Sequence, residues 1–297
     1  MTIRETHDTL LDDIVRLRGL VMMVGAPDTG KSTLARRLLA AAVTAGREVA
    51  YVDADVGQTT TGPPACVGLK WVRRREDIEG IARADELRFV GSTTPEGVVL
   101  QHVVATAALC DVARAGAELV VLDTTGTVSG VIGQTLKYHK MELCLPEAVV
   151  ALQHGAELEP MIGMLRRFFD ATVSVLEVDS DLRPSSPSDR AAKRQEGFAT
   201  AFGPPLQRWR VRSTVFAPTL PAGLDLARLD RMLVGLQDAT GRCRGLGVLE
   251  YGEDTVRVIT NGGEDMRGLR LGSLRIDLET FATERVRLRD IMFGLDA

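Results

Sequence analysis

The sequence predicts an α/β protein in which a parallel β-sheet, covered by helices on both faces, precedes a small, mainly β domain. Three observations support this prediction. A glycine-rich loop at residues 25–32 stands between an apolar run and a run of helical spacing. Apolar runs then alternate with helical segments up to residue 178, which is the order that builds parallel sheets. Beyond Pro205 the apolar spacing shifts towards two, as in short strands.

The glycine-rich loop fits the pattern G-x-x-x-x-G-K-[ST]. An apolar run at 20–24 predicts a strand before it, and Leu34, Leu38 and Leu39 predict a helix after it. In this context the backbone N–H groups of the loop can surround a phosphate, Lys31 can reach the β- and γ-phosphates, and Ser32 can bind Mg²⁺. A chance glycine turn is the structural alternative. The sequence therefore predicts a P-loop that binds a nucleoside triphosphate through Gly25, Asp28, Thr29, Gly30, Lys31, Ser32 and Thr33.

The remaining elements follow in alternation. Strands are predicted at 48–52, 119–122, 148–152 and 172–178, and helices at 98–115, 130–143 and 158–169. The segment 88–90 leads into a polar loop at 91–97, and another polar loop covers 57–64. In an open parallel sheet, ligands bind at the carboxyl ends of the strands. These loops are therefore expected to converge on one site.

The stretch from residue 181 to 205 differs from its surroundings. It begins with prolines and serines, continues as a charged helical segment at 189–201, and ends in Gly203-Pro204-Pro205. This composition predicts a mobile lid near 183–203 whose Arg190 and Arg194 share one helix face. A plain interdomain linker is the alternative. We expect a P-loop domain at 1–204 and a small β domain at 205–297.

Two carboxylates follow predicted strands after the P-loop. Asp123 closes the run 119–122, where a Walker B acid that organises Mg²⁺ usually stands, and Asp55 follows the strand at 48–52. The turn after Asp55 would direct the amide of Gln58 into the same space. For either acid the alternative is a carboxylate that caps a loop.

Composition restricts the class of protein. The chain has 297 residues, is 45% hydrophobic and 26% charged, and carries a net charge of −4, so no global basic field attracts long duplexes. No apolar run or leader-like segment predicts a membrane span or secretion, and the scattered cysteines suggest buried, reduced thiols, so a cytoplasmic protein is expected. Clusters such as Arg73-Arg74-Arg75 are explained by a solvated face. No protein partner is indicated.

With these residues in view, the chain resembles the polynucleotide 5′-hydroxyl kinase family. That family includes the RNA kinase subunit of the pre-mRNA 3′-end cleavage factor and the nucleolar kinases of rRNA processing. The resemblance covers roughly residues 20 to 203. Its blocks are the P-loop with Asp28 at the fourth position, Asp53-Ala54-Asp55-Val56-Gly57-Gln58, Gly91-Ser92-Thr93-Thr94-Pro95, Asp123-Thr124-Thr125-Gly126, and Arg190 with Arg194.

The resemblance implies transfer of the ATP γ-phosphate to the 5′-hydroxyl of a polynucleotide, most often RNA, with DNA as the other candidate. By this resemblance Asp55 is the general base and a metal organiser beside Ser32 and Asp123, and Lys31 is the phosphate lysine. Arg190 and Arg194 form the lid. The acceptor would be bound by a clasp at Thr93, Thr94 and Pro95, and by Gln58, Thr125 and Gly126. Thr127 stands where eukaryotic members have a tryptophan.

Two other functions fit a P-loop. A regulatory or metallochaperone GTPase would show an N-K-x-D-like motif at a strand end, but the candidate strand ends Leu152-Gln153-His154-Gly155. The chain has no cysteine or histidine cluster to hold a metal cargo. The third candidate is a catalytically weak, ATP-binding assembly subunit. The acids and the lysine of the motifs are all present, which argues against this candidate.

Overall fold

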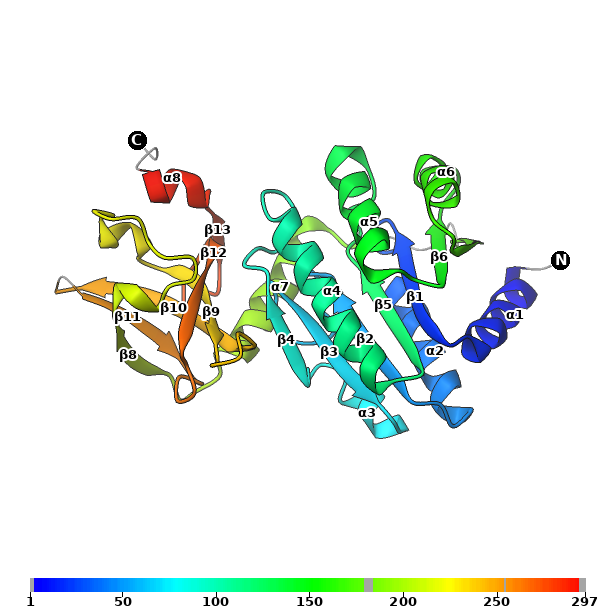
Figure 1. The fold of residues 1–297 in the computed structure, drawn as a ribbon, viewed down its shortest axis with the longest axis horizontal. Coiled ribbons are helices and arrows are strands. Elements are labelled where there is room, and N and C mark those ends of the chain that lie inside the picture. Colours follow the sequence, from blue (N-terminus) through cyan, green and yellow to red (C-terminus); the bar gives the residue numbers. More distant parts are fainter. Residues whose placement is uncertain (1–2, 179–183, 254, 294–297) are drawn as a thin grey trace.

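The computed structural model describes residues 3–178, 184–253 and 255–293 (Figure 1). Residues 181–183, at the start of the predicted lid segment, lie outside the described residues. The strands of the N-terminal part are β1 (Gly19–Gly25), β2 (Val49–Ala54), β3 (Cys66–Val72), β4 (Glu86–Phe89), β5 (Leu119–Thr124), β6 (Ala148–Gln153) and β7 (Thr172–Glu177). Its helices are α1 (Ile3–Arg16), α2 (Lys31–Thr44), α3 (Arg75–Glu79), α4 (Val99–Gly116), α5 (Gly130–Cys144) and α6 (Glu159–Phe168).

The centre of the sheet is parallel. Strands β2, β5, β1, β6 and β7 lie in this order and pair in parallel, and β3 and β4 extend the β2 edge in antiparallel orientation. This arrangement confirms the predicted α/β fold class. The sequence reading did not include α1 or β3. Because β3 lies antiparallel to β2, the N-terminal part is a mixed sheet rather than a purely parallel one.

Helices cover both faces of this sheet, as predicted. Leu11 of α1 and Leu38 of α2 pack on one face, in a cluster with Val121 of β5. Leu109 of α4 and Met141 of α5 pack on the other face, in a cluster that α6 completes. The central strands are therefore buried on both sides, which explains their continuous apolar sequences. Polar residues on these strands occur at the carboxyl ends, where the site lies.

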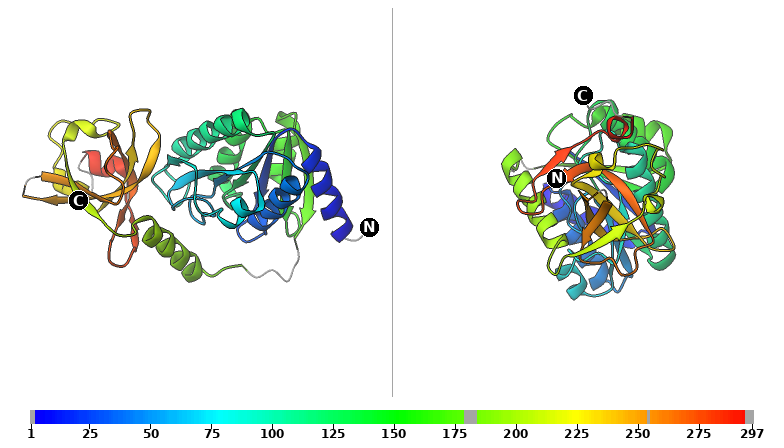
Figure 2. Two further views of the ribbon diagram at one scale, coloured as in Figure 1. Left: turned by 90° about the horizontal axis from the view of Figure 1, so that it is seen from below. Right: turned by 90° about the vertical axis from the view of Figure 1, so that its left-hand side faces the viewer.

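The C-terminal part consists mainly of strands, which confirms the prediction of a small β region. The helix α7 (Pro187–Ala201) leads into it, and Figure 2 shows α7 running beneath the sheet towards these strands. The elements are β8 (Gln207–Val211), β9 (Met232–Gln237), β10 (Cys243–Gly252), β11 (Thr255–Thr260), β12 (Gly268–Ile276), β13 (Thr283–Arg285) and α8 (Leu288–Phe293), with short 3-10 turns at Ser213–Val215 and Leu226–Leu229.

The two parts are joined by strand pairing and by a shared core. Strand β10 pairs with β4 at Cys243 and Leu87, which continues the sheet into the C-terminal strands. Ala65 and Phe89 from the N-terminal part share a hydrophobic cluster with Leu233 of β9. A domain boundary at residues 204 and 205 therefore stays a prediction, since the packing across it is continuous.

Helix α7 is anchored by its second half. Phe198 is fully buried and Phe202 is 3% exposed, and both lie in the cluster that joins the two parts. At the first turn, Ser186 caps the helix and exchanges hydrogen bonds with Asp189 in a capping box. The carboxyl end of α7 is thus fixed to the core, while its amino end extends over the P-loop region.

Other sequence expectations concern the cysteines and the membrane. All four cysteines are free and buried, in agreement with the prediction of core thiols. Within the described part of the chain, no helix is long and apolar enough to span a bilayer.

The anchoring of α7 predicts a large stability cost for Phe198→Ala. Removing a fully buried phenylalanine leaves a cavity, so we expect a loss of about 3–5 kcal/mol in the free energy of unfolding, measured by denaturant titration. Phe168→Ala is the matched control, because Phe168 is 61% exposed. That control is expected to change stability by less than about 0.5 kcal/mol. Equal losses in the two variants would show that Phe198 does not anchor α7.

Candidate functional site

The predicted P-loop connects β1 to α2. Gly30 adopts a left-handed conformation (φ 86°) at the N-cap of α2, and Lys31 is the first residue of the helix. The Lys31 side chain is only 6% exposed, and its Nζ donates to the carbonyl oxygen of Ala26 at 2.6 Å. Burial lowers the pKa of Lys31, and the carboxylates of Asp123 and Asp55 oppose that shift. A buried cation on a glycine loop at a helix N-terminus is suited to bind a phosphate.

Asp123 occupies the end of β5 beside this loop. Its Oδ2 accepts hydrogen bonds from Ser32 Oγ at 2.6 Å and from the Tyr51 hydroxyl at 3.0 Å. Its Oδ1 is buried and has no partner among the described residues. Burial raises the pKa of Asp123, and the hydrogen bond from Ser32 lowers it. Mg²⁺ prefers oxygen ligands, and the Ser32 hydroxyl and the unpartnered Asp123 oxygen lie close enough together to serve as two of them.

The end of β2 is organised by Asp53. Its Oδ1 accepts from the Asp55 N–H at 2.9 Å, and its Oδ2 accepts from the N–H groups of Thr60 and Thr61. Burial, followed by the Asp123 carboxylate, raises the pKa of Asp53 well above its ordinary range, while the backbone donors act in the opposite direction. Asp53 is therefore a buried anchor that shapes the loop after β2.

Asp55 stands at the tip of this loop. Its Oδ1 accepts from the N–H groups of Gly57 and Gln58, both at 3.0 Å, which fixes the orientation of the carboxylate. Among the described residues no hydrogen bond is directed to Oδ2. Asp55 is only partly buried and lines a cavity beside the P-loop. Its second oxygen can therefore accept a proton or contact a cation.

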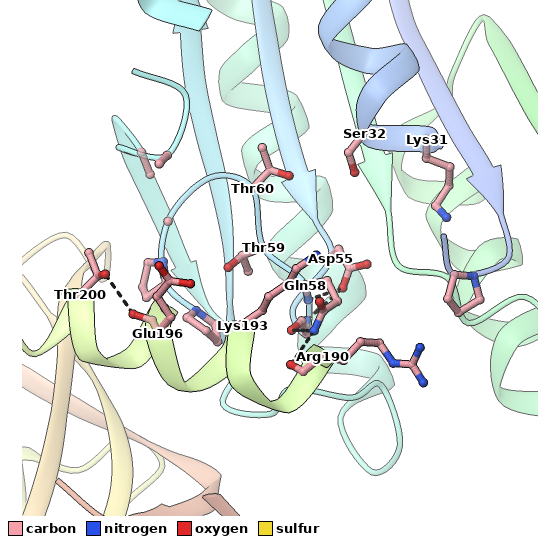
Figure 3. A pocket seen from close by; sticks show the side chains of 18 of the residues that line it. Lys31, Ser32, Asp55, Gln58, Thr59, Thr60, Arg190, Lys193, Glu196 and Thr200 are labelled. Atoms are coloured by element: carbon pink, nitrogen blue, oxygen red, sulfur yellow. Dashed lines mark hydrogen bonds between the residues drawn. The ribbon is translucent and has the colours of Figure 1, made fainter. Parts of the chain in front are cut away.

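A cavity of about 910 Å³ lies between the P-loop, the loop after β2, and α7. Figure 3 shows Lys31 and Ser32 on one side and α7 on the other, with Asp55 between them. Cationic and anionic side chains both line it, a mixture that suits a phosphate with its metal. The charged lining consists of Asp28, Lys31, Arg36, Asp55, Arg190, Lys193 and Glu196.

Helix α7 contacts the site through Arg190. The Gln58 amide donates to the Arg190 carbonyl oxygen at 3.0 Å, and Arg190 Nη1 lies 3.6 Å from Asp28 Oδ2. Asp28 also accepts from the Ser185 N–H at 2.9 Å. The amino end of α7 is thus tied to both the P-loop and the turn after Asp55. Burial and the charge of Arg190 lower the pKa of Arg194, which is not part of the cavity lining within the described ranges.

The loop predicted to be a clasp lies beside the same turn. A Cβ on Gly57 would stand 2.6 Å from the Thr93 carbonyl oxygen, so only glycine permits this approach. The Thr94 hydroxyl donates to Glu96, which pairs with Arg285 of β13 at 2.7 Å. Within the described residues, Thr93, Thr94 and Pro95 do not line the cavity.

The loop after β5 packs against the P-loop. Thr125 is 7% exposed and its carbonyl oxygen accepts from Lys137 at 2.6 Å. Gly126 lies against Pro27, where an added Cβ would be 2.5 Å from the Pro27 nitrogen. These positions of Thr125 and Gly126 point to a contact with the nucleotide loop. Their assignment to acceptor binding stays a prediction.

Several lining residues were not identified from the sequence. Lys193 stands three residues after Arg190, so helical spacing could have placed it on the same face. Arg36 stands one turn after Ser32 on α2, and the same spacing argument applies to it. Thr59 and Thr60 belong to the polar loop after Asp55 and carried no separate signal. In Figure 3, Lys193 and Thr59 face the same space.

Comparison with known proteins agrees with this geometry. Residues 25–203 match a family model described as mRNA cleavage and polyadenylation factor CLP1 P-loop. A polyribonucleotide 5′-hydroxyl-kinase of Pyrococcus furiosus is 27% identical, over 92% of this chain and 86% of that protein. One of Thermococcus kodakarensis is 29% identical, over 87% of this chain and 88% of that protein. The polyribonucleotide 5′-hydroxyl-kinase Clp1 of Rattus norvegicus is 32% identical over 68% of this chain and 52% of that protein.

A solved structure has the same fold. The wild-type Clp1p–Pcf11p (454–563) complex contains a chain that superposes with a TM-score of 0.71, over 92% of this chain and 78% of that chain. The two are 13% identical, so this similarity concerns the fold alone. It extends beyond residues 25–203 and therefore includes part of the C-terminal strands.

The contact of Gly126 with the P-loop predicts a defect in Gly126→Ala. The new methyl group meets backbone atoms of Pro27 and must displace the P-loop, so kcat/KM for ATP is expected to fall roughly 10- to 100-fold. Steady-state kinetics with ATP as the varied substrate provides the measurement. Gly163→Ala on α6 is the control, because a Cβ there meets no atom within 4 Å. A Gly126→Ala enzyme with wild-type kinetics would show that the P-loop tolerates this displacement.

Proposed function

The chain belongs to the family of the mRNA cleavage and polyadenylation factor CLP1 P-loop, and we propose that it is an ATP-dependent kinase of polynucleotide 5′-hydroxyl ends with RNA as its acceptor. The observation that carries this proposal is the convergence of Lys31, Asp55 and Arg190 on one cavity. Relatives that are named polyribonucleotide 5′-hydroxyl-kinases match most of the chain and support the choice of RNA.

The P-loop side of the cavity is assigned to ATP. Backbone N–H groups between Gly25 and Thr33 would surround the phosphates, and Lys31 would exchange its bond to the Ala26 carbonyl for the β- and γ-phosphates. Ser32, Asp55 and Asp123 would hold Mg²⁺, a choice supported by the unpartnered Oδ1 of Asp123. Bound there, Mg²⁺ would offset negative charge on the phosphate oxygens.

The acceptor side is assigned to the loop after β2 and its neighbours. The 5′-hydroxyl oxygen forms a bond to the γ-phosphorus while the bond from that phosphorus to the β–γ bridging oxygen breaks, and ADP leaves. The proton of the hydroxyl passes to Asp55, whose orientation is fixed by the Gly57 and Gln58 N–H groups. Thr93, Thr94 and Pro95 would bind a phosphate of the acceptor, which positions the strand without reading its sequence.

Arg190 is assigned to the transferring phosphoryl group. Its guanidinium is held above the P-loop by Asp28 and by the Ser185 carbonyl oxygen, so a short movement brings it to the γ-phosphate. Negative charge at that group is what an arginine stabilises during phosphoryl transfer. Arg194 is assigned to ATP or to lid closure, and Lys193 adds a further cation on the cavity face of α7.

The direct test is transfer of label from γ-labelled ATP. The protein is incubated with 5′-hydroxyl RNA, with 5′-hydroxyl DNA of the same sequence, with 5′-phosphorylated RNA, or without acceptor. Label on the 5′-hydroxyl RNA alone supports the proposal, and equal labelling of DNA would overturn the choice of RNA. In a parallel incubation with γ-labelled GTP, hydrolysis without transfer would favour a regulatory GTPase. ATP binding with neither transfer nor hydrolysis would favour an assembly subunit.

The assignment of Asp55 predicts the behaviour of Asp55→Asn. The amide keeps the shape of the side chain but cannot accept the proton, so kcat is expected to fall about 10²- to 10⁴-fold. ATP affinity, measured by calorimetry with Mg²⁺, is expected to change much less. Asp123→Asn serves as the comparison, and it should weaken Mg²⁺-dependent ATP binding. A dead Asp123→Asn beside an active Asp55→Asn would reverse the two assignments.

The assignment of Arg190 predicts a loss in the chemical step. Single-turnover transfer at saturating ATP should slow by about 10³-fold or more in Arg190→Ala, as for other arginines that reach a transferring phosphoryl. Arg194→Ala should mainly raise the KM for ATP. Arg167→Ala on α6 is a control, since Arg167 is exposed and does not line the cavity. Losses below about threefold for both α7 arginines would place the transition-state cation elsewhere, with Lys193 the next candidate.

A further inference from the structure

Helix α5 carries two lysines that are completely buried. Lys137 and Lys140 are both 0% exposed, and within the described residues neither forms a salt bridge. Burial lowers the pKa of Lys140 to about 8 and that of Lys137 well below its ordinary value. Removing an ammonium group from water costs several kcal/mol unless its environment compensates. Two such groups on one helix behind the site therefore require an explanation.

Lys137 binds the end of β5. Its Nζ donates to the Thr124 hydroxyl at 2.8 Å and to the Thr125 carbonyl oxygen at 2.6 Å. The Thr124 hydroxyl in turn donates to the Met23 carbonyl oxygen of β1 at 2.7 Å. Lys137 thus connects α5 to the two strands whose ends hold the P-loop and Asp123. Through Thr125 it also supports Gly126, which packs on the P-loop.

Lys140 lies beside a histidine that binds the end of β2. Its Nζ lies 3.0 Å from Nε2 of His102 on α4, and the same nitrogen lies 2.8 Å from the Ala54 carbonyl oxygen. Ala54 directly precedes Asp55. His102 is fully buried, and burial together with Lys140 lowers the pKa of its ring well below the usual value. The Nε2–H of a neutral ring donates to the Ala54 carbonyl oxygen, so this nitrogen cannot also accept from Lys140, whose Nζ lies beside the ring.

The two lysines also face a concentration of negative charge. Asp53 and Asp123 are buried at neighbouring strand ends, and Asp55 lies next to them. The carboxylates of Asp55 and Asp123 interact favourably with the Lys137 ammonium, and those of Asp55 and Asp53 with Lys140. The lysines supply the opposite charge from the side away from the cavity.

We propose that Lys137 and the Lys140–His102 pair are positioning residues for phosphoryl transfer. Lys137 fixes the carboxyl end of β5 through Thr124 and Thr125, and His102 fixes that of β2 through Ala54, with Lys140 packed beside its ring. This inference rests on the proposed kinase function for its effect on rate. The effect of these residues on the strand ends that carry Asp123 and Asp55 can be measured without an acceptor, through the Mg²⁺ requirement for ATP binding. The residues do not line the cavity within the described ranges, so they act through the strand ends.

The critical experiment is Lys137→Met. Methionine fills a similar volume without the charge. Removing a desolvated charge favours the fold and losing two hydrogen bonds disfavours it, so the thermal midpoint is expected to change little. The kcat for transfer should nevertheless fall about 10- to 100-fold, as for residues that orient catalytic groups, with the KM for the acceptor changed less than about twofold. The Mg²⁺ concentration for half-maximal ATP binding should rise about tenfold. A purely structural role would not produce a slower enzyme of nearly unchanged stability.

Controls separate the possible outcomes. Met141→Leu alters the buried neighbour of Lys140 without any charge and is expected to keep wild-type rates. Lys140→Met tests the second branch and decides the question if Lys137→Met does not fold. A loss of activity that merely follows a loss of thermal stability, or an unchanged kcat and Mg²⁺ requirement, would overturn the inference.

An experiment can contradict the proposed function without contradicting the positioning role of the lysines. If the wild-type protein transfers no phosphate to any acceptor, the kinase proposal fails. The Mg²⁺ requirement for ATP binding still tests the lysines in that case. A raised requirement in Lys137→Met supports their role in holding the acids, and an unchanged requirement refutes it.

Discussion

The pairing of β2 with β5 is the constraint on which the site depends. Asp53 and Asp123 are register partners in this parallel pair, and both are 1% exposed. The hydrogen bonds that build the sheet therefore also bring two carboxylates together in a medium of low dielectric, where like charges repel strongly. Several neighbouring groups reduce this cost. Backbone N–H groups bind Asp53, and hydroxyl groups bind Asp123. Lys31 of the P-loop and the lysines of α5 add positive charge near the two acids.

Helix α7 connects this charged centre to the rest of the molecule. Its second half is fixed in the shared hydrophobic cluster through Phe198, and its first turn is bound to Asp28 and Gln58. Because the carboxyl end is buried in the cluster, the amino-terminal turns are the part of the helix with the weaker attachment. The contacts that hold those turns are few, partly exposed and polar. Such contacts exchange readily with a charged ligand, whereas the buried aromatic anchor does not.

The sequence predicted the parallel core and the P-loop because both are local signals: continuous apolar strands, and glycines at fixed spacing before a helix. It did not predict β3, whose seven residues follow a proline-containing loop and lie antiparallel to β2. Helix α1 was missed because its sequence is mostly polar. The buried lysines on α5 could not be found either. Lysine in a helical pattern indicates a solvent face, and the packing of α5 against α4 and the end of β5 reverses that reading for Lys137 and Lys140.

The contacts of the C-terminal strands could not be predicted from the sequence either. Their sequence indicates short strands but not what they contact. In the structure, the Ser273 N–H of β12 donates to the Gly91 carbonyl oxygen at 2.6 Å, and Arg285 of β13 pairs with Glu96. Both ends of the 91–97 loop are therefore held by strands that come almost two hundred residues later in the chain. Since Thr93 of this loop lies against the turn that carries Asp55, the C-terminal strands and the loop after β2 are parts of one packed unit. These contacts of β12 and β13 therefore help to set the position of the 91–97 loop relative to Asp55.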